Sequence, residues 1–503
     1  MALPRFFDRV FAAAGRSLSI ERIDLERILE GRTIALFCGE ECNEEGNARW
    51  MAELLINMLA RLYPQISISA TSSSVEDHLT TIAKDINPLL DLSQGQGKIQ
   101  ISVVIGTHSD FPESAIFPWA GGWVVRLSNE PLPSPGLQNP YAAGAAAAFA
   151  AAEVFRRSFY EFLPEKAAKP FKDFQLSLID FGESNGETLS LKSGSVGELA
   201  FFGLGAIGNP AIWALARHRA LSGKLWLIDD EDVELSNLQR YALAKDKDVE
   251  MAKTELAGRE LYGSDLEYKL FKGKLEDFGD SLSGEFHVPT ICVAVDNVEG
   301  RRISQALLPR LVLNGWTGDG CLGVSWHEFY RDAACLGCLY PPEPGKSQTE
   351  LVAEALGLQP FRAAELWVRA EVPSEEEFQT IAGHLGVKME EIKEWRNQPI
   401  TEIYRGLICS STRLDLKGIK KRAVVPLSHQ SVLTGILLAS ELVKRTDPEL
   451  SKLSQEDGFI IWEDVLSPPG RSWTRVRKRV PGCICGDKIY QEVYAKKWLP
   501  AKR

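Results

Sequence analysis

Short apolar runs of strand length alternate with amphipathic stretches along both halves of the chain. In the first half, turn residues and helical stretches separate four such runs, at 33–38, 66–70, 101–107 and 122–127. The second half repeats this order, with runs that begin at Leu199, Lys224 and Thr290 and a closing helix at 431–444. Such a repeat predicts two doubly wound α/β units with parallel sheets, and it indicates a duplication.

Breaks in this pattern give the predicted domains. Residues 1–181 form the first unit, the Gly- and Ser-rich segment 182–195 is a linker, and residues 196–503 form the second unit. The second unit is longer because it contains residues 345–422, where apolar residues three and four apart predict a helical subdomain. The expected fold class is therefore α/β, with two Rossmann-like domains and one helical insert.

Composition restricts the classes of function. A chain of 503 residues suits about two to four domains, and its net charge of −11 opposes binding to nucleic acid or anionic lipid. No run reaches the roughly 18 to 20 uncharged apolar residues of a membrane span, and the N-terminus lacks a signal-peptide pattern. We therefore expect a cytoplasmic protein with neither nucleic acid nor membrane as a partner.

A glycine-rich turn follows the first strand of the second half. Gly203, Gly205 and Gly208 form the pattern G-x-G-x-x-G between an apolar run and a helical stretch. Glycine lets the backbone approach a phosphate, and the N-terminus of the following helix supplies N–H donors. Asp229, at the end of the next strand, is the candidate ligand of a ribose. Dinucleotide oxidoreductases use the same turn, so the glycines alone indicate only a nucleotide.

The segment DDEDVELSNLQRY at 229–241 is not typical of dehydrogenases. Together with the glycine turn it resembles the ThiF/MoeB and ubiquitin-activating adenylyltransferases, whose acidic strand end is followed by SNLxRQ. Over the whole chain, the resemblance is to the activating enzymes of bacterial ubiquitin-like operons, the BilD-like proteins of antiphage systems. It implies that the protein uses ATP and Mg²⁺ and has a ubiquitin-like protein and a conjugating enzyme as partners.

The same resemblance assigns a nucleotide site. Asp296 would bind Mg²⁺, and the implied contacts of ATP beyond the glycine turn are Asp229, Glu231, Asn237, Arg240, Lys253 and Asn297. Glu231 and Tyr241 depart from the family pattern, which has Asp and Gln there. Arg240, Lys253 and the metal would neutralise the charge that accumulates when a carboxylate attacks the α-phosphate. Each residue alone also fits a surface position or a helix cap, but their order along the chain favours adenylation.

Two close pairs of cysteines predict a closed tetrahedral site for structural zinc: Cys335 with Cys338, and Cys483 with Cys485. Four thiolates leave no position for water, so this metal would not be catalytic. Because the pairs lie far apart in the chain, buried thiols without a metal are the alternative.

Cys409 stands alone in the last part of the predicted insert, after its helical stretches. The ubiquitin-activating enzymes that the chain resembles carry their thioester-forming cysteine at this place, and Arg405 or Arg413 nearby would increase its thiolate fraction. The alternative is a small buried side chain, which is the usual state of a free cysteine.

The corresponding turn of the first half reads Cys-Gly-Glu-Glu-Cys at 38–42, so carboxylates stand where phosphate would bind. The following strand also lacks an aspartate equivalent to Asp296. The first half therefore resembles the inactive adenylation domain of a fused activating enzyme, which makes the chain a monomeric pseudo-dimer. Such domains lend an arginine to the ATP of the partner domain, and Arg16 and Arg22 are the candidates.

Three other functions fit part of the pattern. A sulfur-carrier adenylyltransferase needs the nucleotide site but neither the insert nor the thioester cysteine. A nicotinamide-dependent oxidoreductase explains the glycines but gives no role to SNLQR or Lys253. An inactive scaffold does not explain why the second-half set is intact.

Overall fold

We describe a computed structural model of the chain, which defines residues 3–18, 20–92, 99–163, 173–182, 186–282, 286–318, 321–329, 333–341, 348–385, 387–404, 427–454, 458–462 and 474–499. These residues divide into two compact units, 1–340 with 426–503 and 341–425, and each is described separately. The mixed α/β class and the parallel sheet that the sequence predicts are confirmed. Among the described residues, no helix combines the length and apolar character needed to cross a membrane.

An eight-stranded sheet forms the centre of the second half, in the order β14-β13-β12-β11-β10-β7-β8-β9. The five strands from β11 to β9 in that order run parallel, and β12, β13 and β14 add antiparallel pairs at one edge. The strands are β7 (Gly194–Phe202), β8 (Leu221–Asp229), β9 (Leu266–Lys272), β10 (Thr290–Val293), β11 (Leu311–Thr317), β12 (Leu322–Glu328), β13 (Gly458–Trp462) and β14 (Thr474–Arg475). The predicted strands at Leu199, Lys224 and Thr290 are all present.

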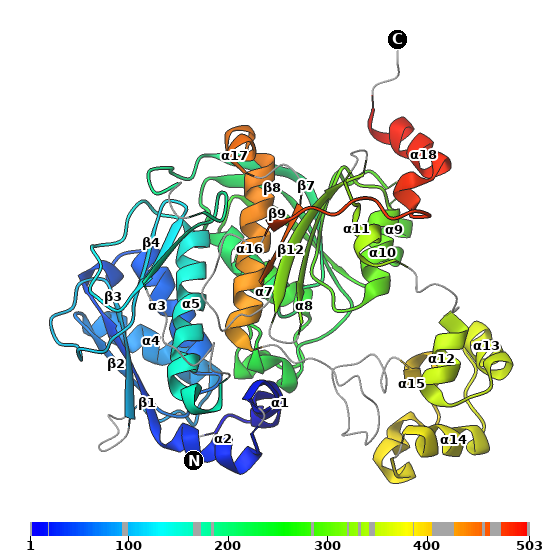
Figure 1. The fold of residues 1–503 in the computed structure, drawn as a ribbon, viewed down its shortest axis with the longest axis horizontal. Helices are drawn as coiled ribbons and strands as arrows, with labels where there is room; N and C mark the ends of the chain where they lie inside the picture. The colour runs from blue at the N-terminus through cyan, green and yellow to red at the C-terminus, as the bar shows by residue number, and fades with distance from the viewer. Residues whose placement is uncertain are drawn as a thin grey trace. The chain divides into compact units, whose positions relative to one another are not determined.

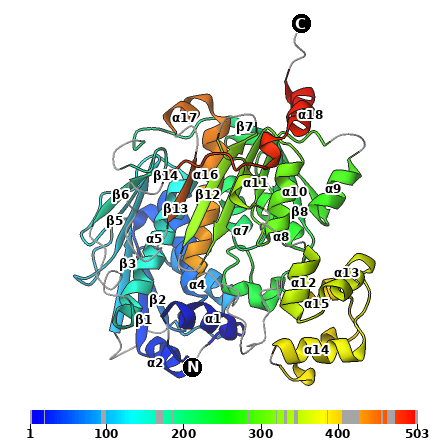
Figure 2. The same ribbon diagram turned by 45° about the vertical axis from the view of Figure 1, so that its right-hand side comes forward.

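Helices and short 3-10 turns connect these strands, and several cover the sheet in Figures 1 and 2. They are α7 (Gly208–Arg217), η3 (Leu235–Gln239), η4 (Asp246–Asp248), α8 (Lys253–Leu261), α9 (Leu275–Ser281), α10 (Val298–Ala306), α11 (Leu336–Leu339), α16 (Ser428–Thr446), α17 (Pro448–Leu453), η8 (Ile484–Gly486) and α18 (Lys488–Trp498). The first residue of α7 is Gly208, so this helix begins directly after the glycine turn.

The first half differs from the predicted doubly wound sheet. Three parallel strands lie in the order β2-β1-β3, but the run at 122–127 belongs to a separate antiparallel sheet, β4-β5-β6. Apolar alternation gives the length of a strand but not its direction, which is why the sequence did not separate the two sheets. The strands are β1 (Arg32–Cys38), β2 (Ile66–Ala70), β3 (Ile99–Ile105), β4 (Phe117–Gly121), β5 (Val124–Ser128) and β6 (Phe174–Ser177).

Helices of the first half surround these sheets and reach the second half. They are α1 (Phe7–Leu18), α2 (Arg22–Glu30), η1 (Glu40–Cys42), α3 (Asn47–Leu59), α4 (Ser73–Ile86), α5 (Pro140–Phe159) and η2 (Tyr160–Phe162). The closing helices α5 and α16 lie side by side in both ribbon views. A methyl group on Gly144 of α5 would overlap Ile436 of α16, so the two backbones approach closely there.

Residues 341–425 form the second compact unit. Its described helices are α12 (Gln348–Leu356), α13 (Pro360–Arg369), α14 (Glu375–Leu385), η5 (Met389–Trp395) and α15 (Ile400–Tyr404). Fully buried apolar side chains such as Leu356, Leu366, Phe378 and Ile403 give it a core of its own. This segment includes the predicted insert at 345–422.

Candidate functional site

The glycine turn lies at the carboxyl end of β7, next to the end of β10. Gly203 has φ +90°, and an ideal Cβ on it would lie 2.8 Å from the carbonyl carbon of Ala294. A Cβ on Gly208 would overlap the carbonyl oxygen of Gly203. Only glycine allows this packing, which leaves a short backbone turn directly before the N-terminus of α7.

Asp229 stabilises the glycine turn from the end of β8. Its carboxylate accepts the Leu204 N–H at 2.7 Å and the Glu231 N–H at 3.0 Å, and the residue is 7% exposed. Burial raises the pKa of Asp229, whereas Lys253 and the two N–H donors oppose that rise. The predicted ribose ligand is therefore a buried carboxylate tied to the turn.

Lys253 is the first residue of α8 and places a buried cation beside Asp229. Its Nζ lies 4.0 Å from an Asp229 carboxylate oxygen, pairs closely with Glu231, and stands 5.4 Å from the centre of the Tyr241 ring. Burial alone would lower the pKa of Lys253, but Tyr241, Asp229 and Glu231 raise it above its ordinary value. The ammonium therefore remains charged at neutral pH.

The loop 235–244 carries the SNLQR residues. Asn237 is buried, and its Oδ1 accepts the Glu234 N–H at 3.0 Å, so this side chain caps η3. Arg240 lies over the Tyr241 ring at 5.7 Å, and its buried Nη1 has no hydrogen-bond partner among the described residues. Tyr241 is also close to the turn, because a Cβ on Gly205 would be 2.9 Å from its hydroxyl. The loop therefore presents Arg240 as a cation without a carboxylate partner in the described part of the chain.

A second arginine, Arg9 of α1, lies near this loop. Burial lowers the pKa of Arg9 to about 10, with a further contribution from Arg240, whose charge has the same sign. Of the candidates from sequence, Arg22 instead pairs with Asp8 and Glu26, and the side chain of Arg16 lies outside the described residues. The sequence analysis missed Arg9, because nothing in the local pattern of α1 indicates that it approaches residue 240.

Asp296 and Asn297 follow β10, next to the strand that carries the glycine turn. Both are exposed, and Asn297 caps α10 by accepting the Gly300 N–H at 2.6 Å. Arg301 is buried and donates to backbone carbonyls at Val295 and Gly315, so it holds β10 and β11 rather than facing solvent. A Mg²⁺ ion here would use the Asp296 carboxylate, with its remaining ligands from phosphate and water.

Four cysteine sulfurs meet in one cluster between α11 and η8. Cys335 Sγ lies 3.9 Å from Cys338 Sγ and 3.5 Å from Cys483 Sγ, and Cys338 Sγ lies 3.5 Å from Cys485 Sγ. All four are within 4.8 Å of one another. Sulfurs about 2.3 Å from a tetrahedral zinc ion are about 3.8 Å apart, so the cluster fits structural Zn²⁺. The Val480 N–H donates to Cys338 Sγ at 3.3 Å, a typical outer contact of a thiolate.

The turn of the first half is filled by its own carboxylate. Glu41 accepts the Thr107 N–H at 2.9 Å, the Thr107 hydroxyl at 2.8 Å and the Ser134 hydroxyl at 2.7 Å. Partial burial favours the neutral acid, but these donors outweigh it and lower the pKa of Glu41. An anion at this turn would therefore meet a fixed negative charge.

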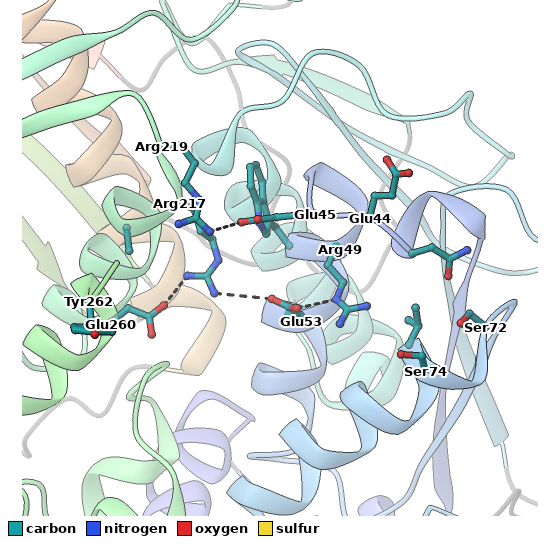
Figure 3. Close-up of a pocket in the computed structure, with 14 residues that line it drawn as sticks. Glu44, Glu45, Arg49, Glu53, Ser72, Ser74, Arg217, Arg219, Glu260 and Tyr262 are labelled. Carbon is teal, nitrogen blue, oxygen red and sulfur yellow. Dashed lines mark hydrogen bonds and ion pairs between the residues drawn. The ribbon is translucent and has the colours of Figure 1, made fainter. Parts of the chain in front are cut away.

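A pocket of about 600 Å³ lies between the two halves and is lined by charged side chains (Figure 3). Arg217, at the C-terminal end of α7, lies between Glu260 and Glu53, with nitrogen to oxygen distances of 2.6 Å and 3.9 Å. Arg49 also pairs with Glu53, at 2.8 Å. Glutamates of the pocket neutralise these arginines. The helix α7 begins at the glycine turn and ends at this pocket, so the pocket is separate from the candidate nucleotide site.

The predicted nucleophile, Cys409, and the neighbouring Arg405 and Arg413 lie outside the described residues. The structure therefore brings together the glycine turn, Asp229, Glu231, Arg240 and Lys253, with Asp296 at the adjacent strand end. Tyr241 and Arg9 are additional members of this group. Tyr241 was visible in the sequence only as a departure from the family pattern.

Comparisons with known proteins identify relatives of both halves. The model of the ThiF family matches residues 175–446, and the model of prokaryotic E2 family C matches residues 39–160. The uncharacterized protein y4jF of Sinorhizobium fredii is 33% identical, over 99% of this chain and 98% of its own. The sulfur carrier protein ThiS adenylyltransferase of Escherichia coli is 26% identical, over 43% of this chain and 88% of its own.

Among solved structures, E. coli MccB in complex with AMPCPP and MccA aligns with a TM-score of 0.34 and 15% identity. The alignment covers 58% of this chain and 66% of MccB, slightly less than two thirds of that protein. The match at 175–446 spans more than half of the 503 residues and contains the glycine turn, Asp229 and Lys253. The chain therefore belongs to the ThiF family.

Proposed function

We propose that the protein activates a ubiquitin-like protein by adenylating its C-terminal carboxylate with ATP. The observation that carries this proposal is the buried, charged Lys253 beside the glycine turn, with Arg240 lacking a carboxylate partner in the described chain. ThiF-family membership supports the same reaction. A nicotinamide-dependent oxidoreductase gives no role to the SNLQR segment or to Lys253.

The chemistry requires little from the protein beyond position and charge. A carboxylate oxygen of the substrate bonds to the α-phosphorus of ATP, and the bond from that phosphorus to pyrophosphate breaks. Lys253 and Arg240 stabilise the negative charge on the reacting phosphate, while Asp229 binds the ribose and holds the turn. Bound at Asp296, Mg²⁺ would supply charge neutralisation on the phosphates.

We further propose that Cys409 accepts the activated acyl group. Its sulfur attacks the acyl carbon of the adenylate, a thioester forms, and AMP leaves with the bonding electrons. Transfer to the cysteine of a conjugating enzyme exchanges one thioester for another. The position of Cys409 in the insert, after its helical stretches, as in the ubiquitin-activating enzymes, supports this assignment. In this proposal the reaction serves a cytoplasmic bacterial antiphage pathway.

The first half has a supporting role in this proposal. The stretch 39–160, which matches prokaryotic E2 family C, contains a single cysteine, Cys42. Cys42 is fully buried and stands beside Glu41, so a thioester on it would require the turn to open. We therefore assign the thiol chemistry to Cys409 and regard the first half as an inactive partner domain within a monomeric chain, with structural zinc at the cysteine cluster.

ATP–pyrophosphate exchange with the candidate ubiquitin-like protein tests adenylation. Lys253→Ala should reduce the exchange rate at least 100-fold, because one cation at a reacting phosphate is worth a factor of about 10² to 10³. Lys272→Ala serves as the control, since Lys272 is exposed and pairs with Asp232. Exchange that persists in Lys253→Ala would contradict the assignment of the site.

A second assay separates adenylation from the thioester step. Cys409→Ala should keep pyrophosphate exchange but form no thioester that a thiol reductant cleaves. A thioester that survives this substitution would refute the role of Cys409. The match to the ThiS adenylyltransferase favours a second candidate, sulfur-carrier adenylation without a thioester. In that case the wild-type protein itself would show exchange but no thioester with its substrate.

A further inference from the structure

Three backbone carbonyls of the loop 235–244 are held by side chains of the first half. Arg61, just after α3, donates from Nη2 to the Ala244 carbonyl at 3.0 Å and from Nη1 to the Leu238 carbonyl. Asn57, on α3, donates to the Ala242 carbonyl at 2.9 Å. These contacts span more than 170 residues of sequence and fix the backbone on both sides of Arg240.

Arg61 is an unusual residue for a purely structural contact. It is 1% exposed, and it forms no ion pair with a carboxylate in the described part of the chain. Its other partner is the Asn57 Oδ1, at 3.2 Å from Nε and 3.0 Å from Nη2. Burial lowers the pKa of Arg61, which shows that the cation is costly to hold there. An apolar side chain would fill the same space without that cost, so the carbonyl contacts themselves need an explanation.

The contacts continue from the loop to the glycine turn. The Leu243 N–H donates to Asn209 Oδ1 at 3.0 Å, and Asn209 Nδ2 donates to the Leu204 carbonyl at 2.6 Å. Leu204 is the residue whose N–H binds Asp229. A continuous series of hydrogen bonds therefore runs from Asn57 through the loop to the turn of the nucleotide site.

We propose that Arg61, together with Asn57, is a positioning residue that holds loop 235–244 so that Arg240 faces the nucleotide. The inference rests on the proposed adenylation site. Loss of the Arg61 contacts frees the carbonyls of Leu238 and Ala244 on either side of Arg240, and the loop keeps only the Asn57 contact at Ala242 and the Asn209 link to the turn among the contacts described above. The Arg240 guanidinium then occupies its productive position for a smaller fraction of time, and ATP binds more weakly.

The test measures Mg-ATP binding by calorimetry on the full chain, together with thermal unfolding of each variant. Arg61→Met should raise the Kd for ATP about tenfold, since two hydrogen bonds to a charged donor are lost. Arg61→Lys should recover part of the affinity, because an ammonium group still donates to carbonyls. Arg49→Met is the matched control on α3, because Arg49 binds Glu53 and the Cys42 carbonyl and should leave the Kd unchanged.

Each outcome separates the inference from its alternatives. A Kd within twofold of wild type in Arg61→Met, with only the melting temperature lowered, overturns the inference and makes the residue merely structural. Should Arg61→Met fail to fold, Asn57→Ala tests the inference instead, because Asn57 is only half-buried. This substitution should raise the Kd for ATP about threefold. A wild-type chain that binds no ATP overturns the adenylation proposal itself. If Lys253→Ala weakens ATP binding but Arg61→Met and Asn57→Ala do not, only this inference is overturned.

Discussion

Gly203→Ala should damage the nucleotide turn by two separable effects. The residue has φ +90°, and a side chain in this left-handed region costs about 1 to 2 kcal/mol. The new Cβ would also lie 2.8 Å from both the carbonyl carbon and the carbonyl oxygen of Ala294. Relief of such an overlap costs typically 1 to 3 kcal/mol, because backbone atoms on the adjacent strand must move. The free energy of unfolding should therefore fall by roughly 2 to 5 kcal/mol.

Gly263→Ala separates the two effects. Gly263 has nearly the same φ, +85°, but nothing lies within 4 Å of its ideal Cβ. Its substitution should cost only the conformational part, about 1 to 2 kcal/mol. Urea unfolding followed by tryptophan fluorescence gives both values, and calorimetry gives the Kd for ATP, which should rise only in Gly203→Ala. Equal destabilisation by the two substitutions, with equal ATP affinity, would refute the tight contact between the turn and β10.

Three further predictions address other parts of the molecule. Cys335→Ser should reduce the bound zinc, measured by mass spectrometry of the metal, from one ion per chain to less than one tenth, because a three-thiolate site binds far more weakly. Glu53→Gln should destabilise the protein at pH 7. Hydrogen bonds from His78 and Arg49 outweigh burial and lower the pKa of Glu53, so in pH-dependent unfolding this difference should shrink as the pH falls below the ordinary glutamate range and through the lowered pKa of the folded state. Arg9→Met should raise the KM for ATP several-fold in the exchange assay, whereas an unchanged KM would exclude Arg9 from the site.

The second-half site was predictable because its signals are local. The glycine turn, Asp229 and Lys253 each stand at the boundary of an element, where the apolar period changes to turn residues. Parallel strands bring their carboxyl ends to one edge, so order along the chain translates into proximity in the fold. The cysteine cluster was predictable for a different reason, because two close pairs of the kind C-x-x-C and C-x-C are typical of metal sites.

The contributions of the first half were not predictable in the same way. Arg9 and Arg61 have no motif around them, and both reach the site through packing between the halves. Arg61 occurs in an ordinary helical context, and the carbonyls that it binds lie more than 170 residues away in the chain. The antiparallel sheet was missed because pairing direction is decided by the connection between strands rather than by their composition.

The two halves use a carboxylate at the turn in opposite ways. In the second half the acid, Asp229, comes from the neighbouring strand end and binds the N–H of Leu204 in the turn. In the first half the acid, Glu41, comes from the turn itself and binds the N–H of Thr107 at the neighbouring strand end. The Glu41 carboxylate at the turn of the first half opposes a phosphate there by its charge. It is also from this half that Arg61 and Asn57 bind the carbonyls of loop 235–244, and in our proposal these contacts position Arg240.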